Sequence, residues 1–191
     1  ALGLVLVMLI LTLFLELKLA IWVAIGIGTA FLGTLLFLPA LGVSINMVSM
    51  FAFILALGIV VDDAIVAGEN IYEYRQRGMG YVEAAARGAR DISVPISFSI
   101  LTNIVAFWPL MTVPGGFGKI WSVIPLVVVT AFIISWVEAL FILPAHLAGV
   151  KESRGGRLHR MQQAFSSGFN RFVRGVYGPI LRLSIRWRYL S

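Results

Sequence analysis

Two adjacent aspartates, Asp62 and Asp63, are the residues of this sequence whose type and position most clearly indicate chemistry. They lie inside residues 47–68, a run that is otherwise uncharged and long enough to cross a lipid bilayer. A charged side chain at the centre of a membrane costs roughly 2.5–3.5 kcal/mol on insertion scales, so such groups are kept where something binds, protonates or pairs with them. We therefore predict that the two aspartates take part in moving ions or protons.

The composition indicates a membrane protein. Of the 191 residues, 60% are hydrophobic and 13% are charged, whereas roughly a quarter of the residues in a soluble domain carry a charge. The chain has no cysteine, which excludes disulfides, thiolate zinc sites and cysteine nucleophiles. Its two histidines, His146 and His159, lack the spacing of metal ligands, so we expect neither a metal site nor a cofactor.

Five segments are apolar enough to cross a membrane, and we predict an all-α, polytopic transmembrane helix bundle over residues 1–150. Polar turns and residues that break helices separate the segments. Ser44 or Asn46 is placed to cap the helix that carries the aspartates. No signal peptide precedes Ala1, so we expect the chain to begin within a helix of a longer polypeptide. The predicted spans are residues 1–15, 19–38, 47–68, 92–111 and 120–143.

Small residues and prolines within these spans predict how the helices pack. Small side chains let helix backbones approach closely in lipid, and proline is tolerated where neighbouring helices satisfy the freed backbone groups. Gly58, one turn before Asp62, offers a flat surface to a partner helix. We predict close packing at the following small residues and bends at the following prolines: Gly26, Ala30, Gly33 and Thr34; Pro95, Pro109 and Pro125.

Basic residues predict the orientation of the bundle. If all five spans cross, fourteen of the fifteen Lys and Arg lie on one side and Lys119 alone lies on the other. The positive-inside rule then places the C-terminal segment, residues 151–191, in the cytoplasm. The pI of about 10.2 reflects the excess of Lys and Arg, which the positive-inside rule explains. No basic face of a soluble fold indicates nucleic-acid binding.

The C-terminal segment is predicted to be an amphipathic helix. Between Leu158 and Val176, apolar residues recur at spacings of three and four, and arginines occupy the remaining face. Gly178 and Pro179 are expected to interrupt the helix, which continues in the same style toward Arg188. We expect it to lie along a membrane surface, although peptides that bind calmodulin-like proteins share this pattern.

The aspartates suit a proton switch. Neighbouring positions on a helix point about 100° apart, so Asp62 and Asp63 can face two different partner helices inside the bundle. Burial favours proton uptake by a carboxylate, and a nearby cation favours release. A cation that approaches and withdraws as the bundle rearranges would load and unload the pair. The alternative is a static buried ion pair that fixes helix packing.

Two further carboxylates and two methionines are weaker candidates for a site. Glu138, in the last span, is a candidate second group on a proton path, or a side chain that reaches water or a neighbouring helix. Glu69 lies seven residues beyond Asp62, on roughly the same face, and is a candidate proton exit or an end-of-helix contact. Met47 and Met50, one turn apart, could bind a soft metal, but ordinary packing is the favoured interpretation.

The sequence around the aspartates resembles a known family. Residues 58–70 are similar to the fourth transmembrane helix of the resistance, nodulation and division (RND) efflux transporters of the AcrB type. Residues 42–46 and 143–145 resemble the same family, in the same order. The resemblance covers essentially the whole chain and implies that the five spans are helices two to six of the N-terminal half. It also implies that residues from about 153 onward form the surface helix and linker toward helix seven.

This resemblance implies part of an efflux pump driven by the proton-motive force, a secondary active transporter and not an enzyme. It implies that Asp62 and Asp63 are proton-relay aspartates whose partner lysine, arginine and threonine lie in the missing half. Glu138 departs from the family pattern, which usually has an apolar or small residue there. The paired aspartates are more similar to exporters of drugs or amphiphiles than to metal exporters, which tend to have a single aspartate followed by alanine.

The resemblance also implies a place and partners. It implies the bacterial inner membrane, contact with membrane lipid and with the remaining half of the transporter, a homotrimer, a periplasmic adaptor and an outer-membrane channel. The alternatives are an exporter of metals, lipids or proteins in the same superfamily, or a membrane scaffold that transports nothing. An intramembrane aspartyl protease is disfavoured because its acids lie on facing helices, whereas these are adjacent on one helix.

Overall fold

The computed structural model describes a helical protein in two compact units. One unit is Lys18–Lys151, and the other combines Ala1–Leu17 with Glu152–Ser191. All regular secondary structure among the described residues is helical, which confirms the predicted all-α fold. The described residues are 6, 9, 12, 17–149, 167–169 and 171–187.

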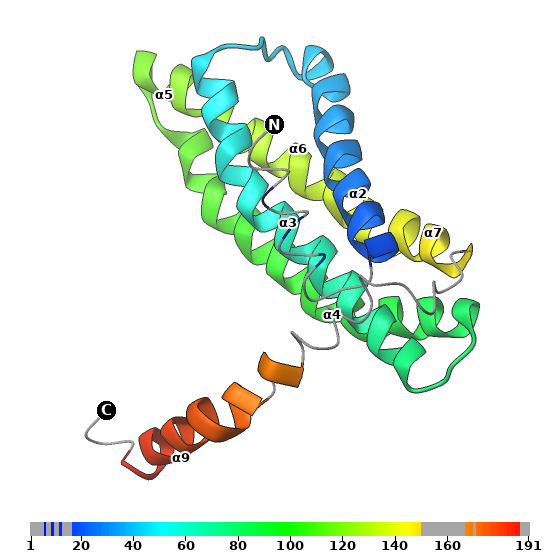
Figure 1. Cartoon of the computed structure of the whole chain (residues 1–191). Helices are drawn as coiled ribbons and strands as arrows, with labels where there is room; N and C mark the ends of the chain where they lie inside the picture. The colour runs from blue at the N-terminus through cyan, green and yellow to red at the C-terminus, as the bar shows by residue number, and fades with distance from the viewer. Residues whose placement is uncertain are drawn as a thin grey trace. The chain divides into compact units, whose positions relative to one another are not determined.

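The Lys18–Lys151 unit is a bundle of long helices joined by short turns (Figure 1). Two 3₁₀ turns follow its first and third long helices, and a π turn joins α6 to α7 without a break. The helices are α2 (Leu17–Phe37), α3 (Met47–Gln76), α4 (Tyr81–Phe107), α5 (Gly115–Trp121), α6 (Val123–Val137) and α7 (Leu143–Gly149). The turns are η1 (Pro39–Leu41), η2 (Trp108–Thr112) and the π turn η3 (Glu138–Ile142).

Four helical segments of this unit are long and apolar enough to cross a membrane. They overlap the last four predicted spans and confirm these as apolar helices of membrane length, although three of the four extend beyond the predicted bounds. The first prediction, residues 1–15, falls outside the described residues apart from Leu6, Leu9 and Thr12. The 30 residues of α3 extend over about 45 Å, against roughly 30 Å of hydrocarbon core. Its last turns can therefore leave the core. The four segments are Leu19–Phe37, Met47–Gln76, Tyr81–Thr112 and Gly115–Gly149.

Asn46 determines where α3 begins. Its side-chain oxygen accepts hydrogen bonds from the backbone N–H groups of Val48 (2.9 Å) and Ser49 (3.0 Å). The Ser49 hydroxyl in turn accepts the Asn46 N–H at 2.8 Å, which completes a capping box. The prediction that Asn46 caps this helix is confirmed, and the Ser44 carbonyl accepts a hydrogen bond from the Ser49 hydroxyl instead.

The three prolines predicted to lie within membrane spans are found in two kinds of helix. Pro95 and Pro125 lie within α4 and α6, which continue past them. Pro109, however, lies in η2, after α4 has ended at Phe107. Gly42 and Gly115 end or begin helices at positive φ angles of 69° and 84°, which glycine adopts without the steric cost of a side chain.

Small residues bring the helices together. On α2, Ala30 and Thr34 are fully buried, and a Cβ added to Gly33 would lie 3.0 Å from the Ile134 side chain of α6. The predicted close packing of these residues is confirmed. On α3, a Cβ at Gly68 would lie 3.1 Å from the Val23 side chain. Close contact of this kind replaces the hydrophobic effect as the source of helix association in lipid.

A close contact between helix backbones joins α3 to α4. A Cβ added to Gly88 would lie 2.8 Å from the Cα atom of Ile71 and 3.0 Å from its backbone nitrogen. Beside this contact, the Asn70 amide donates a hydrogen bond of 2.8 Å to the Gly88 carbonyl. The crossing of α3 and α4 is thus set by backbone against backbone, which leaves no room for a larger residue.

The C-terminal part of the other unit contains a second helical segment. A π turn, η4 (Val173–Tyr177), leads directly into α9 (Gly178–Arg186). The predicted interruption at Gly178 and Pro179 is wrong, because the helix runs on through both residues: the Gly178 N–H donates to the Val173 carbonyl across the π turn, and Pro179 lies in the first turn of α9. On α9, Arg182 and Arg186 share one face, and the remaining surface is mostly apolar with Ser184 within it, as predicted for an amphipathic helix. Its predicted N-terminal part, residues 158–166, lies outside the described residues.

The α3–α4 contact yields a first prediction. Gly88→Ala should destabilise the full-length protein by about 1–3 kcal/mol, because the new methyl group meets the Ile71 backbone, which cannot rotate away as a side chain can. The control is Gly28→Ala on α2, where an added Cβ meets none of the described residues within 4 Å. The thermal unfolding midpoint in detergent measures both effects. Equal midpoints for the two variants would contradict the close contact.

Candidate functional site

The two aspartates lie on different sides of α3. Asp63 is buried, with 7% of its surface exposed, and its Oδ2 atom makes no hydrogen bond with the described residues. It belongs to the buried face of the helix, together with the small residues Ala56 and Ala67. Asp62, one position earlier, is exposed in the described part of the chain. The two carboxylates therefore face different surroundings, as expected for neighbours on a helix.

Asp62 belongs to an exposed stripe of α3 that includes apolar residues. Gly58 and Glu69 lie on the same face at helical spacing, and an added Cβ at Gly58 would meet none of the described residues within 4 Å. Earlier on this face, Phe51 is 50% exposed and Leu55 is 39% exposed. A stripe that joins apolar residues to an aspartate suits contact with further protein better than contact with lipid, because lipid offers the carboxylate no partner.

Neither aspartate forms an ion pair or a hydrogen bond with the residues that the structure describes. Charge removed from water without a partner is strongly unfavourable. A carboxylate in the position of Asp63 must therefore hold a proton or be met by a cation from another part of the polypeptide. Either event changes the net charge inside the bundle, which is the chemistry available to this site.

Glu138 is a second buried carboxylate, at the point where α6 passes into the π turn. Only 3% of its surface is exposed, and it forms no ion pair or hydrogen bond with the described residues. Its carboxylate lies against Gly26 of α2, where an added Cβ would come within 2.8 Å of Oε2. Gly26, predicted as a site of close packing, thus makes room for this carboxylate.

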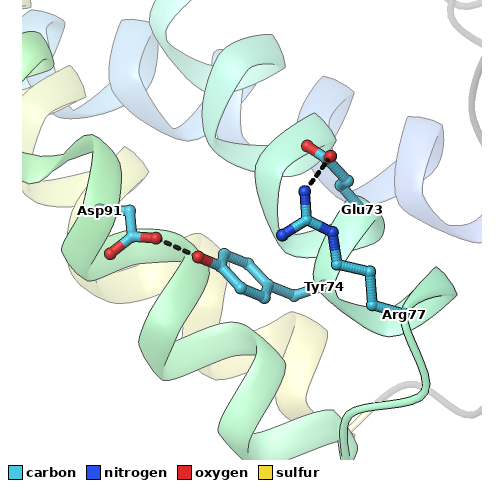
Figure 2. A network of polar contacts seen from close by, with 4 residues as sticks. All are labelled: Glu73, Tyr74, Arg77 and Asp91. Carbon is cyan, nitrogen blue, oxygen red and sulfur yellow. Dashed lines mark hydrogen bonds and ion pairs between the residues drawn. The ribbon is translucent and has the colours of Figure 1, made fainter.

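At the far end of α3, a polar network ties the helix to α4 (Figure 2). The Tyr74 hydroxyl donates to a carboxylate oxygen of Asp91, and Arg77 pairs with Glu73 at 2.6 Å. Glu69, the predicted candidate for a proton exit, is exposed and has no hydrogen bond or ion pair with the described residues. The network holds the end of α3 and does not include Glu69.

Arg75 links α3 to the last helix of the bundle. Its guanidinium group is buried, with 6% of the residue exposed, and donates a hydrogen bond to the Leu147 carbonyl in the last turn of α7. The group also lies over the Tyr81 ring, 5.1 Å from its centroid. A cation at the C-terminal end of a helix is stabilised by the helix dipole, and an aromatic face adds to this.

The structure offers little support for a metal site. No group of three His, Cys, Asp or Glu side chains in the described residues is arranged to hold a metal ion. Met47 is 87% exposed and Met50 is 50% exposed. The His146 ring stacks on Trp22, with 4.4 Å between centroids, and His159 lies outside the described residues.

Four apolar helical segments that could each cross a bilayer, with carboxylates buried among them, define a multi-pass α-helical membrane protein. The model of the AcrB/AcrD/AcrF family matches residues 1–190. The chain belongs to this family, and the resemblance seen around Asp62 and Asp63 is confirmed.

Curated relatives agree with this assignment. The chain is 30% identical to the multidrug resistance protein MdtC of Klebsiella pneumoniae (strain 342), over 88% of the chain and 16% of that protein. It is 32% identical to the toluene efflux pump membrane transporter TtgE of Pseudomonas putida, over 80% of the chain and 15% of that protein. It is also 30% identical to the solvent-resistant pump membrane transporter SrpB of Pseudomonas putida, over 87% of the chain and 16% of SrpB. The chain thus spans about a sixth of the length of these relatives.

Sequence reasoning missed the roles of Arg75 and Tyr74. In the sequence, Arg75 counts only as one of the basic residues that orient the bundle, yet it is buried and caps α7. The available signal is its place four residues after Ile71, on the buried face of α3. Tyr74 has no signal in the sequence, since its partner Asp91 belongs to the next helix.

The buried Arg75 and the exposed Arg77, two positions apart, give a second prediction. Arg75→Met should lower the unfolding free energy of the full-length protein by about 1.5–3 kcal/mol, because a charged hydrogen bond to α7 is lost. The matched control is Arg77→Met, which removes the same charge from an exposed ion pair worth at most about 1 kcal/mol. Chemical unfolding of purified protein measures the difference. A loss for Arg77→Met as large as that for Arg75→Met would show that Arg75 has no special role.

Proposed function

We propose that this chain is part of a proton-driven efflux pump, with Asp62 and Asp63 forming half of its proton relay. The observation that carries the proposal is the burial of Asp63 inside an apolar bundle without a partner among the described residues. Protons are the proposed coupling ion, so the pump is a secondary active transporter and needs no cofactor for this step. Glu138 and Glu69 remain candidates for a secondary proton path.

The exposed stripe on α3 supports a counter-charge supplied from elsewhere in the polypeptide. Asp62 lies on that stripe beside Gly58, whose missing side chain leaves the helix surface flat. A helix of the remaining half could therefore approach Asp62 closely and bring a cation to both carboxylates. Protonation would release that cation, and the two halves of the bundle would rearrange.

The relatives support export of drugs or amphiphiles. Their names describe multidrug resistance, toluene efflux and solvent resistance. We propose the same class of substrate for the intact protein of which this chain is a part. By family resemblance, that protein would lie in a bacterial inner membrane as a homotrimer and work with a periplasmic adaptor and an outer-membrane channel.

Neutral substitutions at the aspartates test the relay. In the intact transporter, Asp62→Asn and Asp63→Asn should each leave the protein folded in the membrane and reduce proton-dependent export to the background of vesicles without pump. The physical reason is that an amide cannot take up and release the proton. Export by everted vesicles under an imposed pH gradient is the readout. Glu73→Gln, an exposed carboxylate on the same helix, is the control and should export normally. Undiminished export by the Asp62→Asn/Asp63→Asn double variant would refute the relay.

The absence of cysteine in this chain permits a test of orientation. In a background freed of any other cysteines, a thiol introduced by Arg186→Cys on the polar face of α9 should react with an impermeant maleimide from the cytoplasmic side only. Lys119→Cys on α5 should react from the opposite side, because the predicted loops alternate. Right-side-out and everted vesicles compare the two accessibilities. Labelling of both sites from one side would contradict the proposed orientation.

A further inference from the structure

A groove lies between α2 and α6, apart from the aspartates. Its volume is about 530 Å³, within the range of 300–1,000 Å³ typical of sites for small molecules. Thr29 and Phe37 of α2 form part of one wall, and Ile133 and Val137 of α6 form part of the other. Glu138 lines the same groove and is its one acidic residue. Both helices belong to segments long and apolar enough to cross a membrane, and Phe37, Ile133 and Val137 of the groove are exposed in the described part of the chain.

The carboxylate of Glu138 has no partner within the groove walls. Only 3% of the surface of this residue is exposed, and it forms no hydrogen bond or ion pair with the described residues. Two hydroxyls line the groove, but each donates to a backbone carbonyl of its own helix: Thr29 to Ile25 at 2.9 Å and Thr130 to Leu126 at 2.7 Å. The lining therefore leaves the acidic group without a donor.

The fit of Glu138 against α2 depends on one glycine. A Cβ at Gly26 would lie 2.6 Å from Cδ and 2.8 Å from Oε2 of Glu138, so any larger residue would push the carboxylate away. At Gly28, two positions later, such a Cβ would meet no described residue within 4 Å. The groove thus combines apolar walls, a buried acidic group and a glycine that keeps this group in place.

We propose that the groove between α2 and α6 binds lipophilic organic cations, with Glu138 as their counter-charge. A buried carboxylate is stabilised by a cation at close range, and apolar walls are stabilised by a hydrophobic body. The aromatic ring of Phe37 adds a surface that attracts positive charge. Neutral or anionic amphiphiles would gain nothing from Glu138. The claim that the bound cation is an export substrate rests on the proposed efflux function. The claim that the groove binds the cation does not depend on the proton relay.

Binding of tetraphenylphosphonium to the purified full-length transporter in nanodiscs tests this site. At alkaline pH, Glu138→Gln should weaken binding by about tenfold or more, because the charge at close range is removed while the shape is kept. Gly26→Ala should also weaken it by displacing the carboxylate, whereas Gly28→Ala should not. Tetraphenylborate, which has the same shape and the opposite charge, should show no loss on Glu138→Gln.

Further experiments distinguish cation binding at this site from the proton relay and from binding of other molecules. Asp62→Asn should bind the cation normally while failing to export it, so the two proposals can fail independently. Photo-cross-linking of the unmodified transporter with an azido derivative of the cation should label peptides within residues 130–142, a result that does not depend on the folding of a variant. Unchanged binding in both Glu138→Gln and Gly26→Ala would overturn the site and would point to a lipid chain or a basic side chain of the remaining polypeptide as the occupant. Labelling confined to other segments would overturn it as well.

Discussion

Charge inside an apolar bundle must be paired or neutralised, and this constraint explains the arrangement of the chain. Asp63 and Glu138 are both buried and have no ion-pair partner in the described residues. By contrast, Arg75 is buried at the end of the bundle, where it donates a hydrogen bond to the Leu147 carbonyl and lies over the Tyr81 ring. The buried cation of this unit therefore has local partners, whereas the two buried acids remain available to protons or to groups from outside.

Helices that approach closely give these acids their surroundings. Gly88 brings the backbones of α3 and α4 together, and Gly26 lets α2 approach the carboxylate of Glu138. Small residues fill the buried face of α3 around Asp63. In lipid, such packing and interhelical hydrogen bonds stabilise the bundle. The exposed stripe with Gly58 and Asp62 is the part of α3 that this packing leaves open. The chain spans about a sixth of the length of its relatives, so the exposed face with Asp62 is available to contact the rest of such a polypeptide.

The spans and the start of α3 could be predicted from the sequence, because apolar runs of membrane length and an asparagine cap are local signals. The end of α3 could not: the apolar run stops at residue 68, but the helix continues to Gln76, where Asn70 and Tyr74 find partners on α4. Nor could the sequence tell that Asp63 is buried and Asp62 exposed, because a helix that is apolar all round carries no clear periodicity. The contact between Gly26 and Glu138 joins distant segments and depends on tertiary packing.

The protonation of the buried carboxylate is the most direct observable of the proposed relay. Infrared difference spectra of the full-length transporter at two pH values report carboxylic acids that gain or lose a proton. We expect a carbonyl band that titrates in the unmodified protein, disappears in Asp63→Asn and persists in Glu73→Gln. A spectrum without such a band, or one that Asp63→Asn leaves unchanged, would contradict the claim that this aspartate exchanges protons.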